Sequence, residues 1–142
     1  MVTPSLTEED YRRLAAFRLA MRQFVAFSEE AARENGLTPR QHQALLGIKS
    51  AQNAGGANIA DLAKFLIIQH HSAVELVDRL VRAGYVERHD DAHDRRRVII
   101  SLTRAGEEKL ASLSAIHLAE IDRIGPELRK LLGKMLKAPL QN

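Results

Sequence analysis

Cysteine and tryptophan are absent from the 142 residues of this sequence, and phenylalanine and tyrosine are few. Without thiols, the chain has no disulfide, no thiolate metal ligand and no thiol-based oxidant sensor. With so few aromatic rings, the core must consist mainly of Leu, Ile, Val and Ala, a composition that favours helices. A domain of this length buries about two-thirds of the surface of its unfolded chain. We therefore expect a single domain, residues 1–142, that is mainly helical.

Long apolar runs are absent as well. No uninterrupted apolar stretch approaches the ~18 residues of a membrane-spanning helix. The first ten residues are polar and partly acidic, unlike the basic and then apolar segments of a secretory leader. We expect a cytoplasmic protein that makes no membrane contact. The formal net charge of +3 and the pI of about 9.5 permit a polyanionic partner without requiring one.

Helical periodicity is most extended near the two ends of the chain. One long helix is predicted over residues 7–35, with Asn35-Gly36 as its C-terminal stop. Another is predicted over about 104–138, and Gly125-Pro126 is expected to break it in two. Apolar residues recur in both helices at spacings of three and four, and one small core cannot cover them all. These stripes predict a homodimer in which the terminal helices form a shared bundle.

The middle of the chain, about residues 38–103, alternates short helices with a predicted hairpin. The expected elements are, in order, a helix over 39–51, a very short strand at Ile59, helices over 61–66 and 69–83, and strands over 85–88 and 98–102. A polar tip, 89–97, joins the two strands. This order is typical of a winged helix-turn-helix, whose second helix enters the major groove of DNA. The predicted fold class is therefore mainly α: a winged helix-turn-helix with long terminal dimerisation helices and a two-stranded wing.

The helix predicted over 69–83 and the hairpin tip carry side chains suited to DNA. Amides, imidazoles and hydroxyls bond to base edges, and arginines on a hairpin tip enter the narrow minor groove. Asp94 is expected to pair with a neighbouring arginine and brace the wing. The predicted contacts with double-stranded DNA are Gln69, His70, His71, Ser72, Glu75 and Arg79 on the helix, and Arg95, Arg96 and Arg97 on the wing.

Several segments resemble the MarR (multiple antibiotic resistance regulator) family of bacterial transcription regulators. The most specific is Asp94-Arg95-Arg96, followed after five residues by Leu102-Thr103 and then Gly106, which is similar to the family's wing motif. Weaker similarities lie in 37–41, 59–63, 76–80 and 84–88. The resemblance implies a triangular homodimer whose two winged lobes bind a pseudo-palindromic operator. It also implies repression, or less often activation, relieved by a small-molecule effector bound between the dimerisation and DNA-binding parts.

Glu75 departs from the family pattern, in which many relatives carry a basic or hydroxyl residue on this outward face. A carboxylate there is repelled by phosphate. It either accepts a hydrogen bond from a cytosine amino group or forms an i,i+4 salt bridge with Arg79, and we favour the salt bridge.

The histidines raise two further questions, since some related regulators bind zinc. His42 and His117 are expected to approach each other between helices, with Glu107 or Glu108 nearby, but the ligand spacing of a zinc site is absent. We expect no metal and no cofactor, and keep a metal-sensing regulator as an alternative. His117 is either a core histidine with one satisfied hydrogen bond or part of an effector pocket. That pocket would be lined by Phe17, Met21, Phe24, Leu45 and His117.

An enzyme is not expected, because Ser72 and its neighbouring histidines lie on one helix and cannot form a nucleophile–base–orienter geometry. The glycine pair Gly55-Gly56 lacks the strand and Lys-Ser/Thr context of a phosphate loop. A winged helix that binds only protein is the second hypothesis, because Asp90, Asp91 and Asp94 offset much of the arginine charge on the wing.

Overall fold

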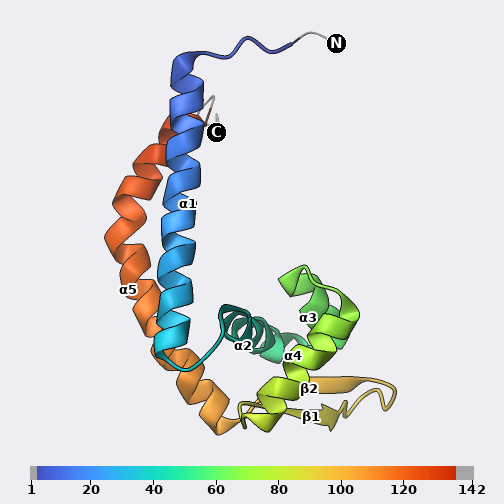
Figure 1. The fold of residues 1–142 in the computed structure, drawn as a ribbon. Coiled ribbons are helices and arrows are strands. Elements are labelled where there is room, and N and C mark those ends of the chain that lie inside the picture. Colours follow the sequence, from blue (N-terminus) through green and yellow to red (C-terminus); the bar gives the residue numbers. More distant parts are fainter. Residues whose placement is uncertain (1–2, 137–142) are drawn as a thin grey trace.

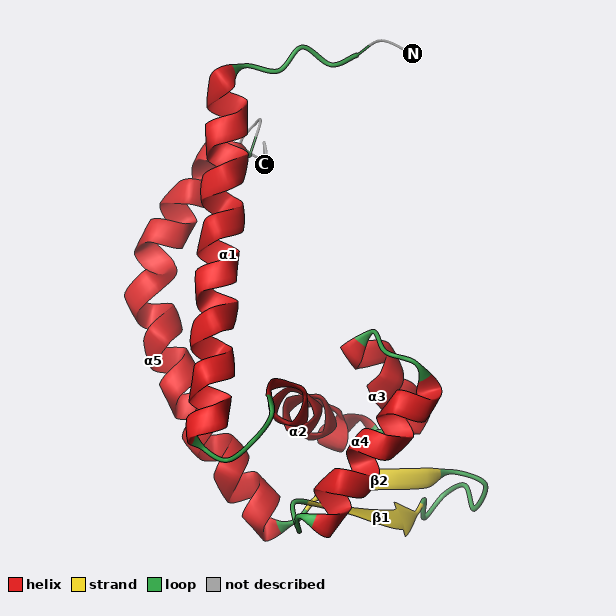
Figure 2. Ribbon diagram, viewed as in Figure 1, coloured by secondary structure: helices red, strands yellow, loops and turns green. Residues whose placement is uncertain are grey.

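The computed structural model describes residues 3–136, which form five α-helices, one short 3-10 helix and a two-stranded antiparallel sheet. The elements are α1 (Glu8–Glu34), α2 (Pro39–Ala51), the short 3-10 helix η1 (Gln52–Ala54), α3 (Ile59–Leu66), α4 (His70–Arg82), β1 (Val86–Asp90), β2 (Val98–Leu102) and α5 (Arg104–Met135). Helices α1 and α5 lie side by side as a long arm, and the elements from α2 to β2 form a lobe at one end of it (Figure 1). The hairpin projects from this lobe as the wing (Figure 2). The mainly helical, winged fold class is confirmed.

Local capping signals place the helix starts where the sequence predicts them. Thr7 is the N-cap of α1 and Thr38 that of α2, each within a capping box. The Thr38 hydroxyl accepts from the Gln41 N–H at 3.1 Å, and the Gln41 side chain accepts from the Thr38 N–H at 2.9 Å. Gly36, with φ of 78°, supplies the left-handed residue that ends α1. The bounds of both helices therefore follow from short-range hydrogen bonds.

The start of α3 differs from the prediction, and the strand expected at Ile59 is wrong. Asn58 is the N-cap, and its side chain accepts from the Asp61 N–H at 2.8 Å. Ile59 is consequently the first helical residue, two positions before the predicted start. Strand pairing occurs at Ala57 instead, whose carbonyl accepts from the Ile100 N–H at 2.8 Å. The side-chain cap satisfies the first helical N–H groups and so extends the helix to this point.

The predicted break at Gly125-Pro126 is also wrong. Helix α5 is continuous through Pro126 and bows along α1 (Figure 1). A proline inside a helix costs about 3 kcal/mol because one hydrogen bond is lost and the ring crowds the preceding turn. Packing against α1 outweighs this cost, and Arg13 of α1 donates to the Lys134 carbonyl at 3.1 Å, beyond the proline. Of the range predicted for this helix, residues 137–138 lie outside the described part of the chain.

The hydrophobic core lies in the lobe and at its junction with the arm. Its largest fully buried side chains are Leu45, Ile48, Leu62, Leu80, Ile100, Leu113, Val77 and Val86. Strand β2 buries the consecutive residues Ile99 and Ile100, whereas Val98 is 44% exposed. Ile99 covers Gly56, where a Cβ would lie 2.7 Å from the Ile99 side chain. Within residues 3–136, no helix combines the length and apolarity that a membrane span requires.

Candidate nucleic-acid interface

Helix α4 separates an apolar inner face from a polar outer face. Ala73, Leu76, Val77 and Leu80 are buried in the lobe at helical spacing. The six predicted DNA-contacting residues of this segment lie on the other side or at its start: Gln69, His70, His71, Glu75 and Arg79 are exposed, and Ser72 is half-buried. Gln69 is the N-cap but makes no side-chain capping bond. The N-terminal end of α4 is therefore open to solvent.

A shallow groove runs between the outer face of α4 and the start of α2. Its lining residues are Thr38, Pro39, Arg40, Ser72, Glu75, Leu76 and Arg79. The salt bridge predicted between Glu75 and Arg79 is absent from the ion pairs of residues 3–136. Both side chains are exposed, and an i,i+4 pair gains only about 0.3–0.5 kcal/mol over hydration. The carboxylate of α4 that does form an ion pair is Asp78, with Arg88 of β1.

Arg40 is a candidate contact that sequence reasoning missed. It lies in the first turn of α2, where a cation opposes the helix dipole, and it forms no ion pair within the described residues. This unfavourable placement of a cation is the sequence feature that could have identified Arg40 as a candidate contact. The structure adds the position of Arg40 in the groove beside Ser72 and Arg79.

The arginines of the wing fall into two groups. Arg95 and Arg96 are exposed at the tip. Arg97 is held against the body of the lobe: its Nη2 donates to the Gly56 carbonyl at 3.0 Å and to the Asp61 carboxylate at 2.9 Å. Its Nη1 lies 3.7 Å from the carboxylate of Asp91. Arg97 therefore braces the wing, a role that the sequence predicts for Asp94.

Asp94 stabilises the tip through the backbone. Its carboxylate accepts from the Arg96 N–H at 3.0 Å, and its carbonyl accepts from the Arg97 N–H at 3.0 Å. The expected carboxylate–guanidinium pair is formed by Asp61 and Asp91 with Arg97 instead. The pKa of Asp61 lies below its usual value, chiefly because of the Asn58 N–H and then because of Arg97. These contacts tie the wing to the start of α3.

The end of the wing motif anchors α5 to the lobe. The Thr103 hydroxyl donates to the Gly84 carbonyl at 2.6 Å and accepts from the Gly106 N–H at 3.1 Å. Gly106 is buried against the backbone of Tyr85, and a Cβ on this glycine would lie 2.1 Å from the Tyr85 oxygen. Only glycine fits this contact, which explains the last residue of the motif.

A polar cluster lies where α1, α2 and α5 meet, and it brings His42 and His117 together as predicted. Their ring centroids are 4.7 Å apart. His117 Nδ1 lies 2.7 Å from the Leu113 carbonyl and Nε2 lies 2.7 Å from the Ser28 hydroxyl. A carbonyl only accepts, so Nδ1 carries a proton and donates to Leu113. Both ring nitrogens of His117 thus have a hydrogen-bond partner, one more than the core-histidine alternative supposes.

His42 has a different environment. It is only 3% exposed, and its Nδ1 has no hydrogen-bond partner among the described residues. Burial, followed by repulsion from His117, lowers the pKa of His42. Glu107, expected near this pair, forms an ion pair with Lys49 at 2.9 Å instead. Within residues 3–136, no three His, Asp or Glu side chains cluster as metal ligands.

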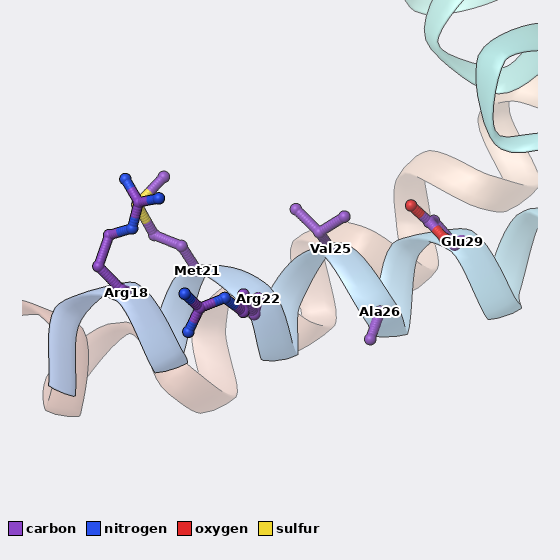
Figure 3. A pocket seen from close by; sticks show the side chains of 6 residues that line it. All are labelled: Arg18, Met21, Arg22, Val25, Ala26 and Glu29. Atoms are coloured by element: carbon purple, nitrogen blue, oxygen red, sulfur yellow. The ribbon is translucent and has the colours of Figure 1, made fainter. Parts of the chain in front are cut away.

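The residues predicted to line an effector pocket are only partly brought together. Phe24 packs edge-on against His117, with ring centroids 6.1 Å apart, and Leu45 is fully buried. Phe17 is half-buried on α1. Met21 lies on another face of α1 and lines a surface pocket formed by that helix alone, with Arg18, Arg22, Val25, Ala26 and Glu29 (Figure 3). The predicted set therefore divides between the junction and this open surface.

Known proteins similar to this chain are transcription regulators. The model of the MarR family matches residues 35–97. The uncharacterized HTH-type regulator YcgE of Bacillus subtilis is 34% identical over 112 residues, which span 77% of this chain and 69% of YcgE. The transcriptional activatory protein BadR of Rhodopseudomonas palustris is 27% identical, and the match spans 75% of this chain but only 55% of BadR. Among solved structures, the S. aureus MepR–DNA complex has the same fold, with a TM-score of 0.65 at 22% identity over 84% of this chain and 91% of MepR.

Proposed function

The chain belongs to the MarR family of transcription regulators, and on that premise we propose that it is a homodimeric, sequence-specific DNA-binding repressor. One observation carries the proposal. The start of α4 and the tip of the wing project on the same side of the lobe, away from the arm (Figure 1). An extended duplex placed against that side meets the polar end of a helix and an arginine-tipped hairpin together, as in winged helix-turn-helix recognition.

The proposed contacts differ in whether another part of the protein already holds the side chain. Arg95 and Arg96 are free to enter a minor groove, whereas Arg97 holds the wing in place through Asp61. Gln69, His70, His71 and Ser72 reach base edges at the start of α4. The groove residues Arg40 and Arg79 meet phosphates, while Glu75 accepts from a cytosine amino group.

The proposed dimer forms through the arm. Apolar side chains are exposed along both of its helices: Tyr11, Leu14, Leu19, Met21 and Val25 on α1, and Ile116, Leu118, Ile121 and Leu132 on α5. A second copy related by a two-fold axis covers these side chains and places two lobes on two half-sites of a pseudo-palindrome.

We place the effector at the junction of arm and lobe. Phe24, His42 and His117 meet there, and α2 leads from this point into the lobe. A small molecule bound at the junction alters the angle of the lobe and hence the spacing of the two recognition helices. A ligand that binds the protein more tightly at one spacing than at the other therefore controls DNA binding.

The first test is selection from a library of genomic duplexes at two salt concentrations. A regulator of this kind recovers one pseudo-palindrome with half-sites about one helical turn apart, and its affinity falls as salt rises. Recovery of no preferred sequence contradicts the proposal and favours the protein-interaction hypothesis. A reporter gene under the selected operator then gives the sign of regulation, since repression requires higher expression in the deletion strain.

The second test concerns the wing. Arg96→Ala weakens binding to the selected duplex by about 1–3 kcal/mol, the usual loss for one specific contact. Arg12→Ala is the matched control, because Arg12 is an exposed arginine on the arm with only an i,i+3 ion pair to Glu9. Equal affinity of the Arg96 variant and the parent at matched salt would show that the wing does not contact DNA.

A further inference from the structure

Ile67 has a backbone conformation that its side chain disfavours. It ends α3 with φ of 54° and ψ of 50°, in the left-handed region. Apart from glycines, it is the one residue with positive φ among residues 3–136. A β-branched residue in this region is an outlier, because its Cβ crowds the backbone. Glycine makes the same turn without strain, so the isoleucine is not there to form the turn.

Burial does not compensate for the strain. Ile67 is 92% exposed, more than any other exposed large apolar residue among those described. The next residue, Ile68, packs partly buried against the core, and its N–H donates to the Ala63 carbonyl at 3.0 Å. The left-handed turn thus serves to direct Ile68 inward, and Ile67 is left pointing to solvent. Both the strain and the exposed apolar surface of Ile67 are therefore unexplained within one chain.

The position of the turn indicates which binding partner can cover the Ile67 side chain. Ile67 lies in the α3–α4 turn, two residues before Gln69, the N-cap of α4. It lies on the same side of the lobe as the wing tip and on the opposite side from the arm (Figure 1). A second copy joined through α1 and α5 does not reach it. A duplex that meets the start of α4 does.

We infer that Ile67 makes an apolar contact with the C5-methyl group of a thymine in the major groove, beside the start of α4. This rests on the proposed DNA binding and names a further specificity-determining residue for it. The thymine methyl is the apolar group that base pairs present in the major groove, and apolar side chains recognise it by contact. The strain at Ile67 is then offset only in the complex.

The experiment uses the full-length chain and the duplex that the parent selects from a randomised pool. Each thymine of a half-site is replaced in turn by deoxyuridine, which keeps the hydrogen-bonding edge and lacks the methyl group. We expect one replacement to lower parent affinity about fourfold, the loss for one buried methyl-sized group. Ile67→Gly lowers affinity for the unmodified duplex about tenfold and is insensitive to that same replacement.

A second variant and a stability measurement separate contact from flexibility. Ile67→Asn tolerates the left-handed conformation but is polar, and it should lose the same sensitivity to deoxyuridine. The Tm of Ile67→Gly, without DNA, should rise by about 1–4 °C as strain is relieved. Parent binding that no single deoxyuridine weakens, or equal sensitivity in parent and Ile67→Gly, overturns this inference while leaving the regulator intact. Failure of the parent to select any duplex overturns the proposed function itself.

Discussion

The lobe and the arm of this protein cover their apolar residues to different extents. In the lobe, Leu45, Leu80 and Ile100 are fully buried between three helices and the hairpin. In the arm, Leu14 of α1 and Leu118 and Ile121 of α5 remain about half exposed although the two helices lie side by side. Two helices touch along one seam only, so the outer parts of wide apolar stripes stay uncovered. The lobe therefore covers most of its large apolar side chains within one chain, whereas the arm leaves a wide apolar surface for the partner of the proposed dimer.

The largest expected effect is in the closed region. Leu80→Ala should lower the free energy of unfolding by about 2–5 kcal/mol, because the fully buried side chain leaves a cavity that rigid neighbours cannot fill. Urea denaturation measures the loss. An effect below 1 kcal/mol would mean that the lobe is as loosely packed as the arm, which would remove the contrast.

The joint between the two regions gives the next effect. Gly106→Ala should cost about 2–3 kcal/mol, since its Cβ would overlap the Tyr85 carbonyl oxygen and push α5 away from the wing. Gly133→Ala is the matched control on the same helix, with nothing within 4 Å of the added Cβ. That control should be neutral or stabilising by about 0.5–1 kcal/mol. Similar Tm changes for both variants would contradict the account of Gly106.

A charge on the uncovered arm should affect association rather than folding. Leu118 is 63% exposed, so Leu118→Glu leaves the single chain intact but places a carboxylate in the proposed dimer interface. We expect the dimer dissociation constant to rise at least about 30-fold, or roughly 2 kcal/mol, by sedimentation equilibrium. Ile67→Glu is the control, because Ile67 is also an exposed apolar residue but lies in the lobe. This variant should leave the dimer dissociation constant unchanged. A parent that sediments as a monomer would refute the assignment of the arm.

The smallest effect concerns the junction. The pKa of His42 is lowered on folding, so the unfolded chain binds the proton more readily than the folded one. The free energy of unfolding is therefore highest above the unfolded pKa of about 6.5, where the ring is neutral in both states. It falls as the pH drops below that value. The groups that face His42 are His117 of α5 and, through His117, Ser28 of α1. Thermal unfolding between pH 7.5 and 5 should show a shallower decline for His42→Leu than for the parent, and parallel declines would exclude this source.

Much of the fold could be predicted because its signals are local. Thr38 and Gln41 form their capping box within four residues, and the left-handed stop at Gly36 depends on that residue alone. The site was only partly predictable for the opposite reason. The sequence alone does not distinguish Arg95, Arg96 and Arg97. Arg97 braces the wing only because the fold brings it to Asp61, which lies 36 residues away in the chain. The α5 break at Pro126 was mispredicted because the packing that opposes it comes from α1.

By itself, the amino-acid sequence determined the order of helices and strands, the polar and apolar faces of α4, and the motif from Asp94 to Gly106. These depend on backbone preferences and on periodicity, which act over a few residues. Only the tertiary structure decided that Glu75 and Arg79 stay unpaired, that His42 is buried without a partner for Nδ1, and that Ile67 is strained and exposed. The burial of His42 and the exposure of Ile67 depend on which distant segments exclude water from those side chains. The Glu75–Arg79 pair stays open because hydration competes with an exposed i,i+4 contact.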